Sequence, residues 1–453
     1  MMLRLIILGA IILLWASSSG EAMAALGLTR AISGSWIPIA SISGLGDDFP
    51  KAIEVCGEKL VVWRRDGDKQ WSVMPDVCSH RHAPLSEGRV NELGCIECPY
   101  HGQSFDTRGS CVHIPQLEAG KSIPAASNIA SYDVKILGDM LFALLPLPLE
   151  KNYPTPPEDL FPLLVNISSY TTRDLPYSLE FLLENFMDPA HIPYAHHSLQ
   201  GTRSDGAPIP MDIRQSDASG VEVNYADSIR GKARTGVVSF KPPAYYHFRV
   251  LRAGVWKIML FILCVPVRRG WSRIHLSLSP GAKLPLPKFL LHAMTNRFLD
   301  TDVWVHDQER VGAGFGNSFF APMTKASRPY VMPSSSDVGV QAFRKWFAEH
   351  MQADAVLGRQ APPPQPIPKE QQLDRFATHA QYCVSCRGAR TRALAVRRYT
   401  PLVALLAVAG LQKLWMRVAA VALAGAVDWV CRLVVRGVEG PERGVPTSAA
   451  RIK

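Results

Sequence analysis

Short apolar runs separated by turns characterise the first third of the chain. Residues 60–63 (Leu-Val-Val-Trp) form one such run, which is followed by Asp66-Gly67 and by a second run at residues 71–74. Runs of this length that contain β-branched and aromatic residues and end at Asp-Gly pairs are typical of β-strands joined by turns. The pattern extends over residues 36–145 and predicts a small all-β domain.

The middle of the chain has a different pattern. Three segments have the apolar periodicity of helices and one long segment is rich in strand-forming residues. The expected helices cover residues 179–187, 290–298 and 340–351, and the β-rich segment covers residues 221–278. Proline-rich stretches flank this part, at residues 146–157 and 361–368. We therefore expect a second, α+β domain over residues 158–358.

The two ends of the chain indicate membranes or targeting. Residues 5–15 are apolar and are followed by small residues, a pattern that is too short to span a bilayer and fits a secretory signal within residues 1–30; an ordinary N-terminal anchor is the alternative. After a proline-rich and CxxC-containing linker at residues 359–398, a basic apolar tail is expected at residues 399–453. This tail is either a membrane hairpin, a pair of interfacial helices or a soluble helical pair.

Charge is concentrated in that tail. The chain has 49 Lys and Arg against 39 Asp and Glu, a net charge of +10, and residues 387–453 alone contain 12 basic and 3 acidic residues. The rest of the chain is nearly neutral, which argues against a nucleic-acid-binding body. A basic and apolar tail favours association with a membrane surface. The nine cysteines form no evenly spaced disulfide framework.

Two Cys-His pairs form the first candidate metal site. Cys78 and His80 lie in one predicted loop, and Cys98 and His101 lie in another. Such loops can hold a [2Fe–2S] cluster in which two thiolates bind one iron and two imidazoles bind the other, an arrangement that raises the reduction potential. A zinc site built on Cys95 and Cys98 is the alternative, although it would need a matching pair elsewhere.

A second candidate site lies on residues 184–197. Asp188 and His191 are spaced as on one face of a helical turn, and Pro193 interrupts that helix so that His196 can return to the same point. Two histidines and a carboxylate form the facial triad of non-haem Fe(II) sites. The carboxylate has four candidates in a later segment, which are Asp300, Asp302, Asp307 and Glu309.

At these residues the chain resembles a known family. Residues 78–89 and 98–116, with both Cys-His pairs, resemble the Rieske domain of the pheophorbide a oxygenase group of Rieske-type non-haem iron oxygenases, to which chlorophyllide a oxygenase is similar. The likeness continues through residues 177–211 and ends near residue 351. One departure is Gln103, where the group usually has Trp. The resemblance implies a Rieske [2Fe–2S] domain followed by a helix-grip-type α+β catalytic domain.

The resemblance also implies roles for single residues. It favours Asp302 as the third iron ligand beside His191 and His196, with Asp300 as the second choice. It assigns Asp188 to an electron-transfer bridge between a cluster histidine and an iron histidine, which in relatives crosses between the subunits of a trimer. Ferredoxin or a similar external reductant is the expected electron donor, because no flavin or nicotinamide motif is present in the sequence.

The implied function is that of a terminal oxygenase. Its [2Fe–2S] cluster and mononuclear Fe(II) would insert O₂-derived oxygen into a chlorophyll-derived tetrapyrrole, with ring opening of pheophorbide a as the first choice and a plastid membrane as the location. Oxidation of a chlorophyllide or protochlorophyllide methyl group and a sterol 7-desaturase-like reaction are the alternatives. A redox-sensing translocon component is the alternative from a different class.

Cys383 and Cys386 form a CxxC pair outside the two sites. They are either a thioredoxin-reducible pair, half of a zinc site or two incidental cysteines. No partner pair lies nearby in the sequence, so zinc is disfavoured and redox regulation is preferred.

Overall fold

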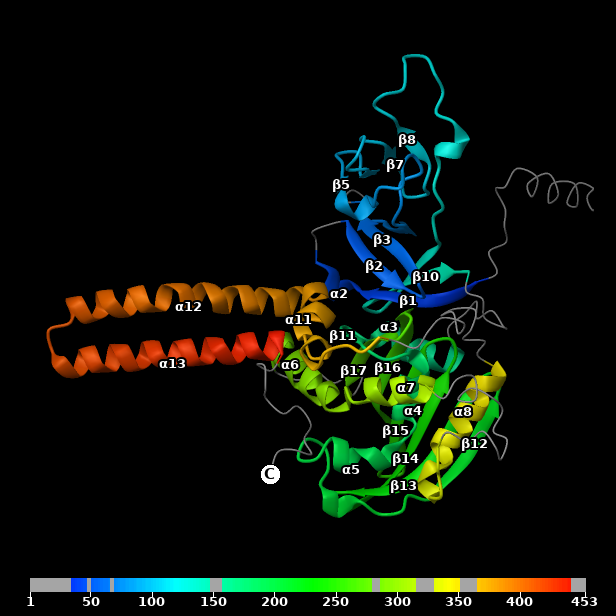
Figure 1. Ribbon diagram of the computed structural model, residues 1–453, viewed down its shortest axis with the longest axis vertical. Coiled ribbons are helices and arrows are strands. Elements are labelled where there is room, and N and C mark those ends of the chain that lie inside the picture. The colour runs from blue at the N-terminus through cyan, green and yellow to red at the C-terminus, as the bar shows by residue number, and fades with distance from the viewer. Residues whose placement is uncertain are drawn as a thin grey trace, which may run out of the picture.

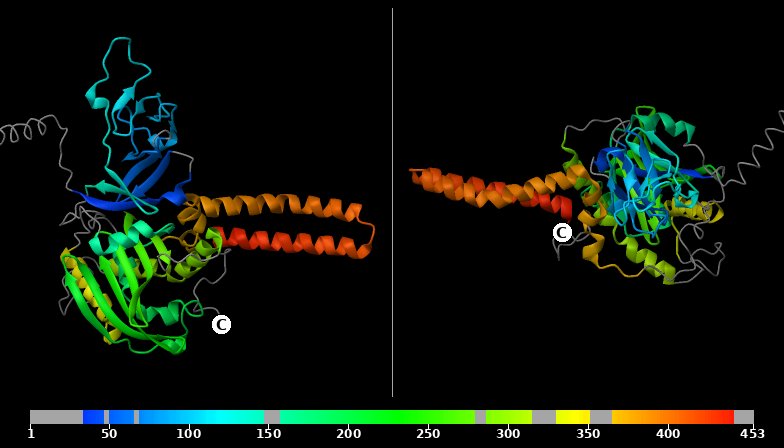
Figure 2. Two further views of the ribbon diagram at one scale, coloured as in Figure 1. Left: turned by 180° about the vertical axis from the view of Figure 1, so that it is seen from behind. Right: turned by 90° about the horizontal axis from the view of Figure 1, so that it is seen from above.

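The chain folds into three parts, which a computed structural model describes over residues 34–46, 50–65, 69–146, 157–278, 286–314, 330–350 and 365–440. An N-terminal β domain lies on top of an α+β domain, and a long helical hairpin projects from the junction of the two (Figures 1 and 2). The expected signal segment, residues 1–30, lies outside the described residues.

The N-terminal domain consists of three small antiparallel sheets. The base sheet has the order β1-β10-β9, the middle sheet the order β2-β3-β4, and the outer sheet the order β5-β6-β7-β8. The strands are β1 (Ser35–Ser41), β2 (Lys51–Val55), β3 (Glu58–Arg64), β4 (Trp71–Pro75), β5 (Arg89–Val90), β6 (Ile96–Glu97), β7 (Ser104–Phe105), β8 (Cys111–His113), β9 (Val134–Leu137) and β10 (Met140–Leu145). The outer sheet carries the loops with both Cys-His pairs, far from the second domain (Figure 1).

A seven-stranded antiparallel sheet forms the second domain, in the order β11-β17-β16-β15-β14-β13-β12. The strands are β11 (Thr171–Leu175), β12 (Met211–Asp217), β13 (Gly220–Ile229), β14 (Lys232–Lys241), β15 (Tyr245–Arg252), β16 (Val255–Arg268) and β17 (Trp271–Leu278). In β13 the alternate residues Val221, Val223 and Tyr225 are buried in the main core. This period of two is why one face of the strand joins the core.

Four helices pack around this sheet: α4 (Leu179–Phe186), α6 (Lys288–Leu299), α7 (Val305–Gly314) and α8 (Val338–His350). Helix α8 lies against the curved sheet because Phe343, Trp346 and Phe347 share one apolar face, and the Trp346 and Phe240 rings lie 5.5 Å apart. The expected α+β fold is confirmed, and the expected helices differ from the observed ones by only one or two residues at each end.

The two domains share part of a hydrophobic core. Ala244 and Val265 of the large sheet pack in one cluster with Val55 and other residues of the N-terminal domain. An ion pair of 2.7 Å joins Arg268 Nη1 to Glu54 Oε2 across the same boundary. The domains are therefore packed against each other rather than joined only by a linker.

The C-terminal part begins with short turns and ends in two long helices. Its elements are α10 (Lys369–Gln372), α11 (Arg375–Thr378), the 3₁₀ turn η9 (Ala380–Tyr382), α12 (Val384–Gly410) and α13 (Leu414–Glu439). Both helices are longer than the apolar segments seen in the sequence, because their arginine-rich halves continue the helix and form pairs such as Arg397–Asp428, at 2.9 Å. Helix α12 thus starts within residues 359–398, the expected linker.

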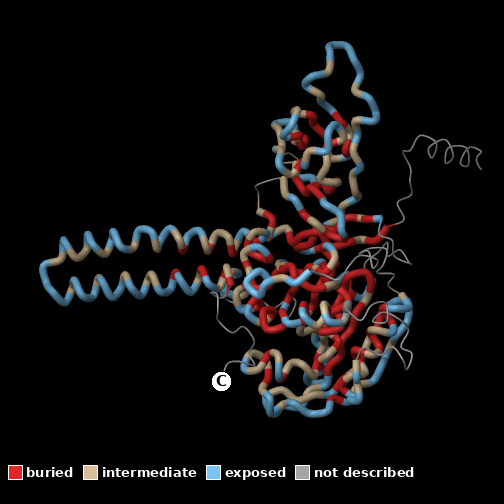
Figure 3. The backbone as a smooth tube through the Cα atoms, in the orientation of Figure 1, coloured by how far each residue is buried: buried red, intermediate tan, exposed pale blue. Residues whose placement is uncertain are grey.

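The hairpin of α12 and α13 is mostly exposed along its length (Figure 3). Large apolar side chains such as Leu405, Leu406 and Leu423 are about two-thirds exposed. Both helices are long and apolar enough, by length and composition, to cross a membrane.

Candidate metal centres

The two Cys-His loops have the same backbone hydrogen bonds. In the first loop the N–H of Cys78 donates to the carbonyl of Ala83, and the N–H of His82 donates to the carbonyl of Cys78. In the second loop the N–H of Cys98 donates to the carbonyl of Gln103, and the N–H of Gly102 donates to the carbonyl of Cys98. The turning residues His82 and Gly102 have φ of 59° and 72°, which is the left-handed region. The two loops therefore have equivalent backbone conformations.

The four expected cluster ligands divide by exposure. Cys78 and Cys98 are buried in the core of the outer sheet, whereas His80 is exposed and His101 is half-buried. The rings of His80 and His101 lie with their centroids 4.8 Å apart. Buried sulfurs on one side and two imidazoles at the solvent side suit a two-iron cluster with one iron toward each pair.

Gln103 occupies the position beside the Cys78 sulfur. Its amide oxygen lies 3.6 Å from Sγ of Cys78, and its amide nitrogen lies 3.2 Å from Sγ of Cys111. Cys95 and Cys111 are buried residues of this small domain. The departure from the family at Gln103 therefore changes the contacts around a cluster loop and leaves the four ligand positions in place.

The second site starts where helix α4 ends. The helix stops at Phe186, because Asp188 precedes Pro189 and adopts an extended conformation with φ −110° and ψ 93°. Asp188 then caps the 3₁₀ turn η4 (Pro189–His191), and Pro193 lies in the first turn of α5 (Ile192–Ala195). The expected helical face through Asp188 and the expected break at Pro193 are wrong: the chain already turns at Asp188-Pro189.

Hydrogen bonds fix the orientation of both expected histidine ligands. Nδ1 of His191 donates to the backbone carbonyl of Asp188, and Nδ1 of His196 donates to Oγ1 of Thr301 at 2.7 Å. Thr301 can accept this bond because its own hydroxyl donates to the carbonyl of Phe298. Each ring therefore presents Nε2 with a free lone pair, the tautomer that a metal requires.

The three expected iron ligands meet at one point. Nε2 of His191 and Nε2 of His196 are 3.2 Å apart, and Oδ2 of Asp302 is 3.3 Å from Nε2 of His196. Metal bonds of about 2.1 Å at right angles would place neighbouring ligand atoms about 3.0 Å apart.

Oδ1 of Asp302 is buried without a hydrogen-bond partner. Burial lowers the pKa of His196, which keeps its ring neutral. These residues fit a metal ion.

Asp302 stands in the short turn η6 (Asp300–Asp302) after helix α6, and Asp300 of the same turn points elsewhere. Asp300 lies between two arginines, at 2.6 Å from Arg173 Nη2 and 2.7 Å from Arg375 Nη2. Its carboxylate is thus neutralised and turned away from the histidines. The geometry favours Asp302 over Asp300.

The other two carboxylate candidates lie outside the site. Asp307 is 59% exposed and lies near surface cations. Glu309 accepts a hydrogen bond of 2.8 Å from the backbone N–H of Ser178, at the start of α4. Glu309 thereby ties α7 to the helix that leads into the iron site.

Asp188 keeps part of its side chain accessible. Its side chain is 32% exposed, and one carboxylate oxygen lies 3.8 Å from Nδ1 of His191. The cluster loops near β5 and β7 lie at the opposite end of the molecule from α5 (Figure 1).

His197, the neighbour of His196, accepts a hydrogen bond from the N–H of Arg203, so it has a structural contact in a turn.

A third group gathers four residues that the sequence does not connect. His292, His379, Cys383 and Cys386 are all buried, and their ligand atoms lie within 4.8 Å of one another. The sequence has no partner pair near the CxxC, and the structure instead brings two histidines to it, one of them 91 residues away in the chain. The spacing of His379, Cys383 and Cys386 was the only available signal.

Comparison with known proteins gives two family matches. The Rieske [2Fe–2S] domain family matches residues 35–133, and the pheophorbide a oxygenase family matches residues 240–318. The chain is 30% identical to chloroplastic pheophorbide a oxygenase of Arabidopsis thaliana in an alignment of 398 positions, which covers 78% of this chain and 72% of the relative. It is 28% identical to protochlorophyllide-dependent translocon component 52 of the same plant, over 78% and 73% of the two chains.

Solved structures show the same fold at low identity. Dicamba monooxygenase matches 70% of this chain and 96% of its own, with a TM-score of 0.55 and 18% identity. NdmB of Pseudomonas putida CBB5 matches 73% and 97%, with a TM-score of 0.52 and 20% identity.

The expected cofactors are confirmed: the protein has a Rieske [2Fe–2S] cluster and a mononuclear iron. It is an oxygenase, and Rieske oxygenases use O₂ and electrons from a ferredoxin-type donor. Its chloroplastic relatives indicate a plastid location. The chain therefore belongs to the pheophorbide a oxygenase family of Rieske-type non-haem iron oxygenases.

Proposed function

We propose that this oxygenase opens the macrocycle of pheophorbide a, at an iron held by His191, His196 and Asp302. The observation that carries the proposal is the convergence of these three side chains in a chain that is similar to pheophorbide a oxygenase over most of its length. Cys78, His80, Cys98 and His101 hold the cluster in this proposal.

The residues around the site prepare it for that chemistry. When bound, the mononuclear iron supplies the position at which O₂ reacts, and the cluster supplies electrons. Asp188 and Thr301 hold the two imidazoles with Nε2 toward one point, so that no reorientation of the ligands is needed. The Phe298 ring stacks on His196 with centroids 3.7 Å apart and covers one face of the ligand.

The proposed electron path runs between two copies of the chain. Within one chain the cluster loops near β5 and β7 lie at the opposite end from α5, the helix that follows Asp188 (Figure 1). The Asp188 carboxylate is partly accessible and lies 3.8 Å from Nδ1 of His191. A neighbouring chain in a homotrimer can bring His80 or His101, which lie at the tip of their loops, to Asp188. A ferredoxin-type protein reduces the cluster in this arrangement.

The hairpin is the proposed membrane element of the protein. Its outer half has no charged residue on α12 between Arg398 and Lys413, a stretch of fourteen residues. This stretch is about 21 Å long at about 1.5 Å per residue, which is shorter than a bilayer core of about 30 Å. We propose that the tip of the hairpin inserts into a plastid membrane.

The test is turnover of a defined set of pigments by the full-length protein in detergent. The protein, ferredoxin and a ferredoxin reductase are supplied with ¹⁸O₂ and with pheophorbide a, chlorophyllide a or protochlorophyllide a, and Asp302→Asn is the inactive control. The proposal expects ¹⁸O in a product of pheophorbide a together with loss of the macrocycle absorption. A product from chlorophyllide a or protochlorophyllide a alone, with an intact macrocycle, would instead identify a methyl-group oxygenase.

A further inference from the structure

The strongest unassigned feature is the group of His292, His379, Cys383 and Cys386 at the root of the hairpin. The residues come from different elements: His292 from helix α6, His379 from the turn after α11, and the two cysteines from the first turn of α12 and the residue before it. All four side chains are buried, with His379 fully so and Cys386 1% exposed.

The distances among the four side chains are those of ligands around one ion. Sγ of Cys386 is 3.2 Å from Nε2 of His379 and 3.6 Å from Nδ1 of His292, and Sγ of Cys383 is 3.4 Å from the same Nδ1. Tetrahedral zinc, with bonds of about 2.3 Å to sulfur and 2.05 Å to nitrogen, places a sulfur and a nitrogen about 3.6 Å apart. The observed spacing therefore matches a tetrahedral site.

Simple thiol–imidazole hydrogen bonds explain the group less well. Nδ1 of His292 faces both sulfurs at similar distances, and one nitrogen lone pair accepts only one good hydrogen bond. A cation at the centre of the group resolves this conflict, because all four ligand atoms can then bind the cation.

One histidine is also oriented by a second hydrogen bond. Nδ1 of His379 donates to the backbone carbonyl of Thr172 in β11, so its Nε2 has a free lone pair toward Cys386. Metal-binding histidines are usually held in this way by a carbonyl or carboxylate behind the ring. Two thiolates, two neutral imidazoles and one divalent cation also give a site without net charge, which suits its burial.

We propose that His292, His379, Cys383 and Cys386 bind a structural zinc ion that fastens the hairpin to the catalytic domain. Zinc binding releases the two thiol protons to solvent and involves no change of oxidation state. The set of two sulfurs and two nitrogens is typical of zinc, and all four positions are filled by protein, as in structural rather than catalytic sites. This proposal goes beyond the oxygenase function and does not depend on the substrate.

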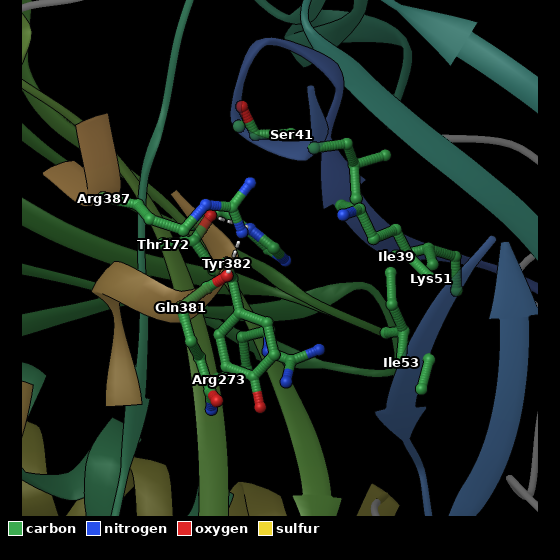
Figure 4. Close-up of a pocket in the computed structure, with 14 residues that line it drawn as sticks. Ile39, Ser41, Lys51, Ile53, Thr172, Arg273, Gln381, Tyr382 and Arg387 are labelled. Carbon is green, nitrogen blue, oxygen red and sulfur yellow. Dashed lines mark hydrogen bonds between the residues drawn. The ribbon is translucent and has the colours of Figure 1, made fainter. Parts of the chain in front are cut away.

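The position of the site explains what the ion would hold together. The adjacent residue Tyr382 lines a pocket between the N-terminal domain and the root of α12, which Ile39 and Ile53 line from the other side (Figure 4). Helix α6, which supplies His292, continues into the turn with Asp302. The zinc would thus join the hairpin, β11 and the helix that leads to the iron ligand.

The experiment measures metal content and ligand type in the full-length protein purified from zinc-supplemented medium. The proposal expects about one zinc per chain in addition to the iron, and the same zinc content in Asp302→Asn, which excludes zinc bound in place of the mononuclear iron. His292→Asn and Cys386→Ser should each lower the zinc content at least tenfold. Cys431→Ser, which changes another buried cysteine of the hairpin, is the matched control and should retain the zinc.

A second measurement uses the wild-type protein, so that the test does not depend on whether the variants fold. Wild-type protein grown with Co²⁺ in place of zinc should show sulfur-to-cobalt charge transfer and tetrahedral d–d bands in its absorption spectrum, after subtraction of the Rieske spectrum recorded on the zinc protein. Protein without zinc or cobalt, or zinc retained in both His292→Asn and Cys386→Ser, would overturn the proposal. A Cys383–Cys386 disulfide that takes up no zinc after reduction would also overturn it and would favour a redox pair.

Discussion

Oγ1 of Thr301 lies 2.7 Å from Nδ1 of His196 and thereby decides which nitrogen of this histidine faces Asp302. Thr301 is the residue immediately before Asp302, so one short turn after α6 supplies both a proposed iron ligand and the hydrogen bond that orients a second one. The iron site therefore depends on the position of that turn as much as on the ligands themselves.

Loss of this hydrogen bond should weaken the iron site without removing a ligand. Thr301→Val keeps the shape of the side chain, and we expect iron affinity or turnover to fall about 10–100-fold. Thr295→Val, on the preceding helix α6, is the control, because the Thr295 hydroxyl bonds to the carbonyl of Leu291. Equal iron content and turnover in both variants, by metal analysis and a turnover assay, would refute the orienting role.

The two aspartates of the turn should behave differently. Asp302→Asn should lose the mononuclear iron and keep the Rieske absorption and EPR spectra. Asp300→Asn should keep the iron and lower thermal stability, because it leaves Arg173 and Arg375 facing each other in a buried place. Metal analysis together with calorimetry separates the two outcomes, and iron lost only from the Asp300 variant would reverse the assignment.

Electron transfer between chains can be tested by complementation. Asp188→Asn alone should keep a reducible cluster and lose at least about 99% of turnover, in line with the proposed bridge. Cys98→Ser alone should lack the cluster. Mixed oligomers of the two variants, purified with two different tags, should recover activity, because an intact cluster then faces an intact Asp188. No recovery in mixed oligomers of confirmed composition would mean that the path is not between chains.

A buried histidine far from the metal ligands should contribute to acid sensitivity. His247 in β15 is 2% exposed, and burial, together with the positive charges of Arg249 and Lys241, lowers its pKa to about 3; Asp159 opposes this. Since the unfolded chain binds the proton at a pKa of about 6.5, stability falls as the pH drops from about 6.5 toward 3, by about 2 kcal/mol at about pH 5.

Replacement of this side chain should therefore reduce the effect of pH. In His247→Leu the difference in Tm between pH 7 and pH 5 should be a few degrees smaller than in the wild type, as followed by calorimetry. The exposed His113→Leu is the control and should leave the difference unchanged. An unchanged difference in His247→Leu would show that folding does not lower the pKa of this ring.

The hairpin should bind membranes through the tip of its apolar half. Leu402, Leu405 and Leu406 are exposed, and their insertion into lipid would contribute several kcal/mol to membrane binding. Changing all three to Gln should therefore abolish co-flotation with neutral lipid vesicles. The control changes Thr391 and Ala395 to Gln on exposed positions of the basic half. Flotation that is equally strong in both variants would contradict insertion of the tip.

Local patterns in the sequence were sufficient for much of this structure. The alternation in β13 and the spacing of Phe343, Trp346 and Phe347 predict their strand and helix, because a single buried face determines each element. The Cys-His loops are equally local, since each contains its ligands within a few residues. Such features need no knowledge of the rest of the fold.

Contacts between distant segments were not predictable in the same way. The choice between Asp300 and Asp302 depends on Arg173 and Arg375, which lie more than 70 residues away on either side of the turn. The partner histidine of the CxxC, His292, is similarly distant and has no motif around it. Its role follows only from the packing of α6 against the root of the hairpin.

One measurement tests the central claim most directly: a single turnover of protein reduced in the absence of air and then mixed with pheophorbide a and ¹⁸O₂. Freeze-quenched samples give the reduced Rieske EPR signal and the mass of the pigment at the same time points. The account predicts that the signal disappears as an ¹⁸O-containing, ring-opened pigment appears, in the wild type and not in Asp302→Asn. A cluster that stays reduced beside unchanged pheophorbide a, in protein with full iron content, would contradict it.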